Sequence, residues 1–190
     1  MNKWKVAFLV LAGAVILSLV SVVYLATADV QQARPKEPIA LEGNILTVET
    51  TAKEFEAIAK QYLSDAMKKS PVPVELVVDE KIYLYSTLTV FNIELPIQMD
   101  FSPVVSKGNI ILQQDAVHVG KFNIPPNTVL KLMKDSVDFP SWITVQPNDE
   151  QIYVDLSRIN IASGSRLRAQ EIDLANDKIV LQVVIPNESK

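Results

Sequence analysis

The sequence predicts an α+β protein: an N-terminal transmembrane helix followed by a long, twisted, mostly antiparallel sheet wrapped around an amphipathic helix. Three observations lead to this fold class. An apolar run without a charged residue extends from Val6 to Ala28. After Thr51 the apolar residues recur every three or four positions, which indicates a helix. After Val72 they occupy every second position, which indicates strands.

The apolar run is long enough to cross a bilayer, because a helix of about 20 residues spans the hydrocarbon core. Lys3 and Lys5 precede the run and Asp29 follows it. The positive-inside rule therefore places the N-terminus in the cytoplasm and the rest of the chain outside the cell membrane. Ala26-Thr27-Ala28 also fits a signal-peptidase site, but signal peptides have a shorter apolar region of about 7 to 15 residues. We expect residues 1–29 to stay attached as a cytoplasmic tip and single-pass anchor.

The rest of the chain divides into a polar, proline-bearing linker, residues 30–48, and one extracytoplasmic helix-plus-sheet domain, residues 49–190. The sequence contains no cysteine, which excludes lipoprotein attachment and disulfide bonds. The net charge is −4, and this acidic balance argues against a nucleic-acid partner. Stability of the domain must therefore come from its core.

A helix is expected over residues 51–69, because Thr51 and Glu54 have the spacing of a capping box. Pro71 and Pro73 end it. One face of this helix carries a continuous apolar stripe: Phe55, Ile58, Ala59, Tyr62, Leu63, Ala66 and Met67. Packing of the stripe on a sheet is the minimum that we expect, and lining a ligand site would be an additional role.

The first strands follow this helix. Residues 72–78 and 82–90 have the alternation of a β-hairpin, and residues 93–101 continue it. The apolar positions change parity between Val90 and Phe91, which predicts a bulge or turn there.

A second strand pair is predicted at residues 109–112 and 116–122, separated by the polar Gln113-Gln114-Asp115. A short helix over 128–136 should follow, because Pro125-Pro126-Asn127 is a helix start signal. Four closing strands complete the domain, with Asn176-Asp177 as a turn between the last two: residues 142–145, 151–156, 166–174 and 178–185.

The sequence offers no motif of an enzyme. His118 is the only histidine, lies in a strand pattern, and is not accompanied by a G-x-S-x-G nucleophile elbow. We interpret Ser163-Gly164-Ser165 as a hairpin loop, and carboxylate pairs such as Glu94 with Asp100 or Asp173 with Asp177 as solvated surface groups. Metal-ligand spacings and phosphate-binding glycine loops are absent from the sequence. We therefore predict no catalytic residue, no metal and no cofactor.

The layout of the chain resembles the YpmS family of Firmicute membrane-anchored proteins. The resemblance lies in the lysine-flanked span, the T-x-x-E-F helix start at residues 51–55, and the segments 140–143, 151–156 and 167–174, so it covers nearly the whole chain. The helix-plus-sheet pattern of that family is similar to the tubular lipid-binding (TULIP) superfamily. This similarity implies a TULIP-like fold and an apolar ligand held between helix and sheet.

Two functional hypotheses follow. In the first, the protein is a membrane-anchored lipid-binding protein that holds an acyl chain or amphiphile in an apolar groove and serves envelope lipid transport or sensing. The expected groove residues are Phe55, Ile58, Tyr62, Leu63, Met67, Leu84, Leu88, Ile93, Leu95, Ile97 and Met99. In the second, the core is fully packed, and the domain is an accessory or scaffold protein for an envelope enzyme or a cell-wall component.

Overall fold

The computed structural model describes residues 3–27, 35, 37–39, 43–68, 70, 72–90, 93–120, 124–161 and 164–187. The chain forms two compact units, Met1–Gln31 and Gln32–Lys190. The first unit contains helix α1, Lys3–Thr27. Its stretch Trp4–Ser21 is long and apolar enough to cross a membrane and none of it is buried. The predicted N-terminal apolar helix is thus confirmed, whereas its orientation stays a prediction.

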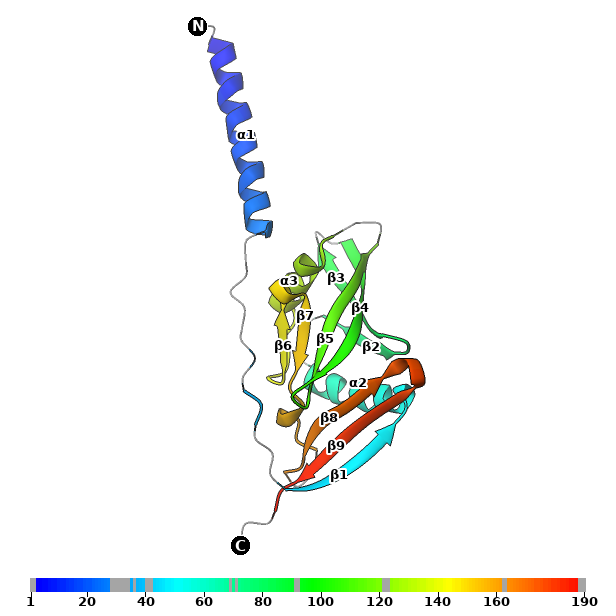
Figure 1. Cartoon of the computed structure of the whole chain (residues 1–190). Coiled ribbons are helices and arrows are strands. Elements are labelled where there is room, and N and C mark those ends of the chain that lie inside the picture. The colour runs from blue at the N-terminus through cyan, green and yellow to red at the C-terminus, as the bar shows by residue number, and fades with distance from the viewer. Residues whose placement is uncertain are drawn as a thin grey trace. The chain divides into compact units, whose positions relative to one another are not determined.

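The second unit contains two antiparallel sheets (Figure 1). The larger sheet has the strand order β2-β3-β4-β5-β7-β6. Its strands are β2 (Val74–Val78), β3 (Ile82–Val90), β4 (Ile93–Ser106), β5 (Asn109–Val119), β6 (Ile143–Gln146) and β7 (Gln151–Val154). The smaller sheet has the order β1-β9-β8, formed by β1 (Asn44–Thr50), β9 (Lys178–Ile185) and β8 (Arg166–Asp173). Three short 3-10 helices, η1 (Pro147–Asp149), η2 (Leu156–Arg158) and η3 (Leu174–Asn176), join the later strands.

Two helices belong to the second unit, α2 (Ala52–Ala66) and α3 (Pro126–Ser136). The predicted capping box at the start of α2 is confirmed: the Glu54 amide donates to Thr51 Oγ1 at 3.3 Å, and the Thr51 amide donates to Glu54 Oε2 at 3.4 Å. Helix α3 begins at Pro126, within the predicted start signal and two residues before the expected first residue, Thr128. Both helices therefore begin where local sequence signals place them.

The register of the six-stranded sheet gathers its apolar residues on one face. Leu76 pairs with Leu84, Leu84 with Met99, and Met99 with Val117. Cross-strand partners share a face of the sheet, so these residues form one row, and the rows beside it add Ile82, Phe101, Ile110 and Ile152. Helix α2 packs against β2, and α3 packs against β5 and β6. The hydrophobic core lies against this face of the sheet.

Strand β5 differs from the prediction of two short strands. It is continuous, and the polar residues in its middle form a β-bulge: Phe101 pairs with Gln114 and Asp100 with Ala116, which leaves Asp115 as the extra residue. The bulge places Gln114 and Val117 on the same face although their sequence parity differs. Asp115 is held by Lys81 Nζ at 2.8 Å and Ser102 Oγ at 2.7 Å. The bulge expected at Val90–Phe91 falls partly on residues 91–92, outside the described residues.

Strand β1 was not predicted. Residues 44–48 were expected in the linker, but they pair with β9 from Asn44 opposite Ile185 to Thr50 opposite Ile179. Of the four closing strands, β6 and β7 join the main sheet, but β8 and β9 form a separate sheet with β1, so the structure has two antiparallel sheets instead of the one extended sheet that we expected. The Ala169 amide donates to the Gly108 carbonyl at 2.8 Å and links the two sheets. Pairing between strands so far apart in the sequence cannot be read from a local pattern alone.

The second unit contains its own hydrophobic core. The core cluster draws on both sheets and both helices, and its most enclosed side chains include Phe101, Met99, Leu130 and Met133. We therefore expect residues 32–190 to fold without α1.

Candidate functional site

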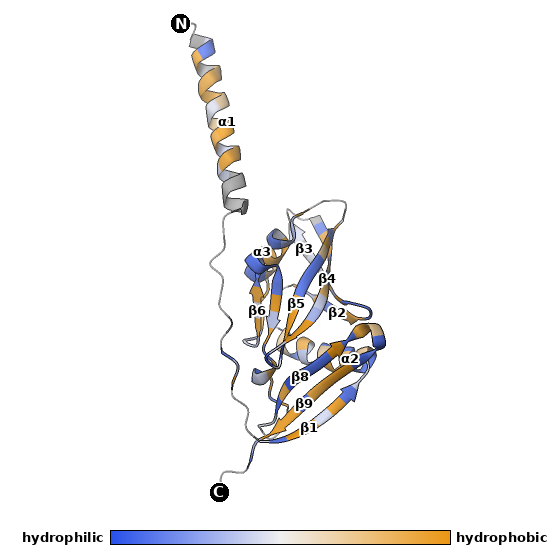
Figure 2. Ribbon diagram, viewed as in Figure 1, coloured by the Kyte–Doolittle hydropathy of each residue, from blue (hydrophilic) through white to orange (hydrophobic). Residues whose placement is uncertain are grey.

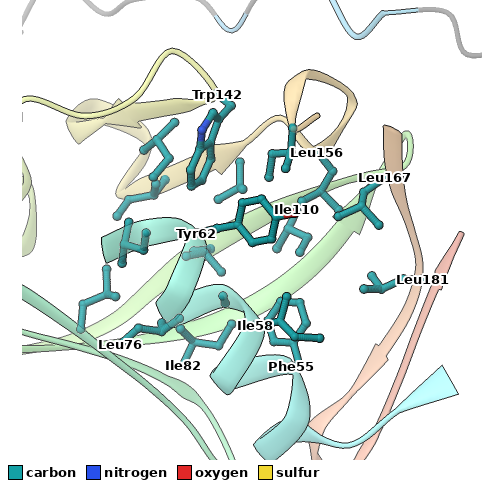
Figure 3. Close-up of a pocket in the computed structure, with 18 of the residues that line it drawn as sticks. Phe55, Ile58, Tyr62, Leu76, Ile82, Ile110, Trp142, Leu156, Leu167 and Leu181 are labelled. Carbon is teal, nitrogen blue, oxygen red and sulfur yellow. The ribbon is translucent and has the colours of Figure 1, made fainter. Parts of the chain in front are cut away.

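The described part of the domain contains an apolar pocket of about 210 Å³ between α2, the six-stranded sheet and the three-stranded sheet (Figure 3). Helix α2 and segments of both sheets contribute to its wall. The lining residues are Val48, Thr50, Phe55, Ile58, Ala59, Tyr62, Leu63, Val74, Leu76, Ile82, Leu84, Ile110, Leu112, Phe139, Trp142, Ile143, Ile152, Val154, Leu156, Ile159, Leu167 and Leu181.

The chemistry of this wall is almost purely hydrocarbon. Among the described residues, Thr50, the Tyr62 hydroxyl and the Trp142 indole supply the only polar side-chain groups of the wall, and no charged residue lines it. A buried water needs two to four polar partners, and apolar cavities stay dry. The pocket therefore favours an apolar occupant over water.

Helix α2 supplies the first wall because its apolar stripe faces the sheets. Phe55, Tyr62 and Leu63 are partly buried, whereas Ile58 lines the pocket and is 53% exposed to solvent. In Figure 3 the Tyr62 ring extends from the helix toward Ile110. These four predicted residues are brought together as expected from their helical spacing.

An ionised side chain holds α2 against β2. Glu56 Oε2 accepts a hydrogen bond from the Val78 amide at 2.6 Å, and Glu56 Oε1 lies 2.8 Å from Lys60 Nζ. The hydrogen bond from Lys60 and then that from Val78 lower the pKa of Glu56. The link fixes one side of the helix wall to the sheet.

The sheet walls differ from the predicted ones. Of the predicted strand residues Leu84 lines the pocket. Leu95 packs against the core cluster, Ile97 is buried in it, and Met99 is fully enclosed. This end of the apolar face is closed core, because α3 packs there on β5 and β6 with Val129, Leu130 and Met133 buried.

Of the three other predicted groove residues, one lies outside the pocket wall, and the side chains of two are not among those that the structure describes. Met67 lines a neighbouring, more polar cleft together with Leu63. Leu88 and Ile93 belong to β3 and β4, but their side chains lie outside the described residues.

Sequence reasoning missed the wall that the three-stranded sheet provides. Val48 of β1, Leu167 of β8 and Leu181 of β9 line the pocket, and the register pairs Val48 directly with Leu181. The alternation of Leu46, Val48 and Thr50 was the one available signal, but it lay in the segment expected to be linker.

The residues considered for catalysis make hydrogen bonds and contacts that support the fold. His118 lies on the opposite face of the six-stranded sheet, with Nε2 3.8 Å from Asp100 Oδ2. Asp173 accepts a hydrogen bond from the Asn176 amide, and Asp177 accepts one from the Ala52 amide at 2.7 Å. The described residues contain no cluster of three or more His, Cys, Asp or Glu side chains that could hold a metal ion.

Comparison with known proteins gives a family for the chain. Residues 2–185 match the family described as "Uncharacterized protein conserved in bacteria (DUF2140)". The chain belongs to the DUF2140 family. It is also 28% identical over 190 residues, 99% of this chain and 100% of the relative, to the "Uncharacterized protein YpmS" of Bacillus subtilis (strain 168). No solved structure matches.

The DUF2140 match extends from the start of α1 to the end of β9. It confirms the resemblance to a YpmS-like family, whereas the similarity to the tubular lipid-binding superfamily stays a prediction. Because DUF2140 is an uncharacterised family, the pocket residues are assigned from their geometry alone.

Proposed function

We propose that this DUF2140 protein is a single-pass membrane protein whose extracytoplasmic domain binds the hydrocarbon chain of a lipid or another amphiphile between α2 and the sheets. The observation that carries the proposal is the pocket: an apolar space, free of charged lining residues, that opens beside the exposed Ile58. Binding sites are typically apolar concavities with few polar groups.

The size of the pocket limits what it can hold. An apolar cavity of about 150 Å³ is large enough for benzene, so about 210 Å³ accommodates a segment of a hydrocarbon chain rather than a whole lipid. Each methylene removed from water contributes about 0.8 kcal/mol. The rest of the ligand would extend out of the pocket past Ile58.

The apolar helix α1 supports a membrane setting for this activity. Its apolar stretch, Trp4–Ser21, has the length and hydropathy of a membrane span, and Lys3 and Lys5 at its start favour a cytoplasmic N-terminus. A domain that binds hydrocarbon chains and is tethered near a bilayer is suited to envelope lipid transport or sensing.

A matched pair of alanines on α2 provides the test. Ala59 lines the pocket, whereas Ala57 is exposed on the helix. We expect Ala59→Phe to fill the space and to weaken binding of a fluorescent fatty-acid probe to the domain, residues 32–190, by more than tenfold. Ala57→Phe should bind the probe like the wild type.

Thermal unfolding of both variants controls for overpacking, and Ile58→Asp gives a second way to block the pocket at an exposed position. Failure of the wild-type domain to bind the probe, or equal binding by the Ala59→Phe variant, would contradict the proposal. Such a result would favour the accessory-protein hypothesis and direct attention to a protein partner.

A further inference from the structure

The three-stranded sheet ends in a segment that we call the sheet tip, residues 44–46, 166–168 and 183–185. Leu46, Val183 and Leu167 form one cross-strand row of the tip. Successive rows alternate between the two faces of a sheet. The row of Leu46 therefore shares its face with the row two positions further along, which contains Val48 and Leu181 of the pocket. The sheet tip therefore continues the apolar face that lines the pocket, and Leu167 belongs to both.

Three aliphatic side chains of the tip are exposed, whereas Val184 is buried at 3% exposure and Leu167 and Val183 are partly buried. Leu46 is 56% and Ile185 42% exposed on the pocket face, and Ile45 is 57% exposed on the opposite face. Figure 2 shows hydrophobic residues along β9 and at the beginning of β1. Exposed aliphatic residues on an edge strand such as β1 mark a surface that binds something.

Basic residues accompany these aliphatic residues. Arg166 shares a row with Ile45, and Arg168 lies in the next row on that face. Lys107 and Arg168 line a common cleft. Within the described residues, none of these three cations takes part in an ion pair, whereas Arg158 is paired with Asp155 at 2.8 Å. The tip thus combines free positive charge with exposed hydrocarbon.

The chain that follows α1 reaches the domain beside the tip. The Ile39 amide donates to Ser157 Oγ at 3.0 Å, and Arg158 Nη2 donates to the Glu37 carbonyl at 3.1 Å. Glu37 and Ile39 line the same cleft as Lys107 and Arg168. The residues numbered 28–36 can span at most about 35 Å, so the tip is tethered within reach of any membrane that α1 crosses.

We propose that the sheet tip docks on an anionic lipid bilayer. Leu46, Ile45 and Ile185 enter the boundary between headgroups and acyl chains, and Arg166, Arg168 and Lys107 contact the anionic headgroups. A peripheral membrane site combines these two contributions, apolar burial and attraction of basic residues to anionic lipid. That lipid chains enter the pocket through this contact rests on the proposed function, but the docking does not.

Co-sedimentation of the domain, residues 32–190, with lipid vesicles tests the docking. We expect binding to vesicles of phosphatidylglycerol and phosphatidylcholine and much weaker binding to phosphatidylcholine alone. Leu46→Glu and, separately, Ile45→Glu should each lower the partition coefficient by more than tenfold. Arg166→Gln should lower it by about fivefold, since each basic residue at a membrane surface contributes about 1 kcal/mol.

Leu132→Glu is the matched control, because Leu132 is 42% exposed on α3, a helix that packs on β5, β6 and η1 rather than on the three-stranded sheet. It should bind vesicles like the wild type. The docking is overturned if the wild type does not sediment, if it binds neutral vesicles equally well, or if both glutamate variants bind unchanged. It is also overturned if sedimentation velocity shows a dimer that Leu46→Glu dissociates while no variant binds vesicles, since the tip would then join two copies.

The Ala59→Phe variant separates this inference from the proposed function. It should lose the fatty-acid probe and keep its vesicle binding. Probe binding without vesicle binding would refute the docking and leave the lipid-binding function in place. Vesicle binding without probe binding by the wild-type domain would refute the lipid-binding function and support the docking.

Discussion

The β-bulge in β5 lowers the folding stability of the domain at one residue, Gln114. Its side chain is buried on the apolar face, and within the described part of the chain neither its amide nitrogen nor its amide oxygen has a hydrogen-bond partner. Its backbone amide, in contrast, donates to the Glu150 carbonyl at 2.8 Å. An unsatisfied buried polar group costs about 1–3 kcal/mol. The bulge keeps the apolar face continuous and leaves this amide inside it.

Replacement of Gln114 by leucine should therefore stabilise the domain. We expect Gln114→Leu to raise the free energy of unfolding by about 1 kcal/mol, measured by urea denaturation. Gln113→Leu is the control, because Gln113 is exposed and its Nε2 already donates to the Asp149 carbonyl. A fall in stability for Gln114→Leu would show that the amide has a role that its buried position does not reveal.

Among the elements, α2 has two functions, since it covers the core and forms a pocket wall. Its attachment through Glu56 depends on the ionised carboxylate, whose pKa is lowered by Lys60 and by the Val78 amide. A carboxylate with a lowered pKa in the folded state stabilises the fold above its unfolded pKa. That contribution is lost as the pH falls through the folded pKa.

This linkage predicts how Glu56→Gln behaves with pH. At pH 7 the variant should be less stable than the wild type, and the difference should shrink as the pH falls from about 5 to about 3. Denaturant unfolding at several pH values measures it. Glu80→Gln, in the exposed turn after β2, should show no such convergence, and a constant difference for Glu56→Gln would contradict the assigned role.

Strand β1 depends on a glycine at its start. Gly43 has a φ of 155°, and a Cβ there would clash with the Ile185 carbonyl oxygen. Gly43→Ala should therefore disturb the pairing of β1 with β9 and lower the free energy of unfolding by about 1–3 kcal/mol. Gly120→Ala is the comparison, because Gly120 also has a positive φ but a Cβ there would meet nothing within 4 Å. Equal losses for both variants would show that the contact with Ile185 is unimportant.

Local signals predicted those elements that local interactions specify. The Thr51–Glu54 capping box located α2, and period-two alternation located the β2–β3 hairpin, because both depend on residues close in the chain. Strand β1 escaped prediction because its partner is β9, at the other end of the domain. Strand β5 was divided because a bulge reverses the parity of its apolar positions at Asp115.

At the scale of the whole molecule, the candidate site lies where the helix meets both sheets. The helical wall was predictable, since Phe55, Ile58, Tyr62 and Leu63 share one helix face. The strand wall was not, because alternation identifies a buried face without showing which part of it α3 closes. Met99 is enclosed in that closed part, whereas its cross-strand partner Leu84 lines the pocket.

The most direct test of the account is mass spectrometry of organic extracts from the purified domain, residues 32–190, beside an unrelated protein handled identically. We predict one lipid class at near-stoichiometric amount in the wild type and its loss from the Ala59→Phe variant. No enrichment over the unrelated protein, also after incubation with envelope lipids, would contradict the proposed lipid-binding function.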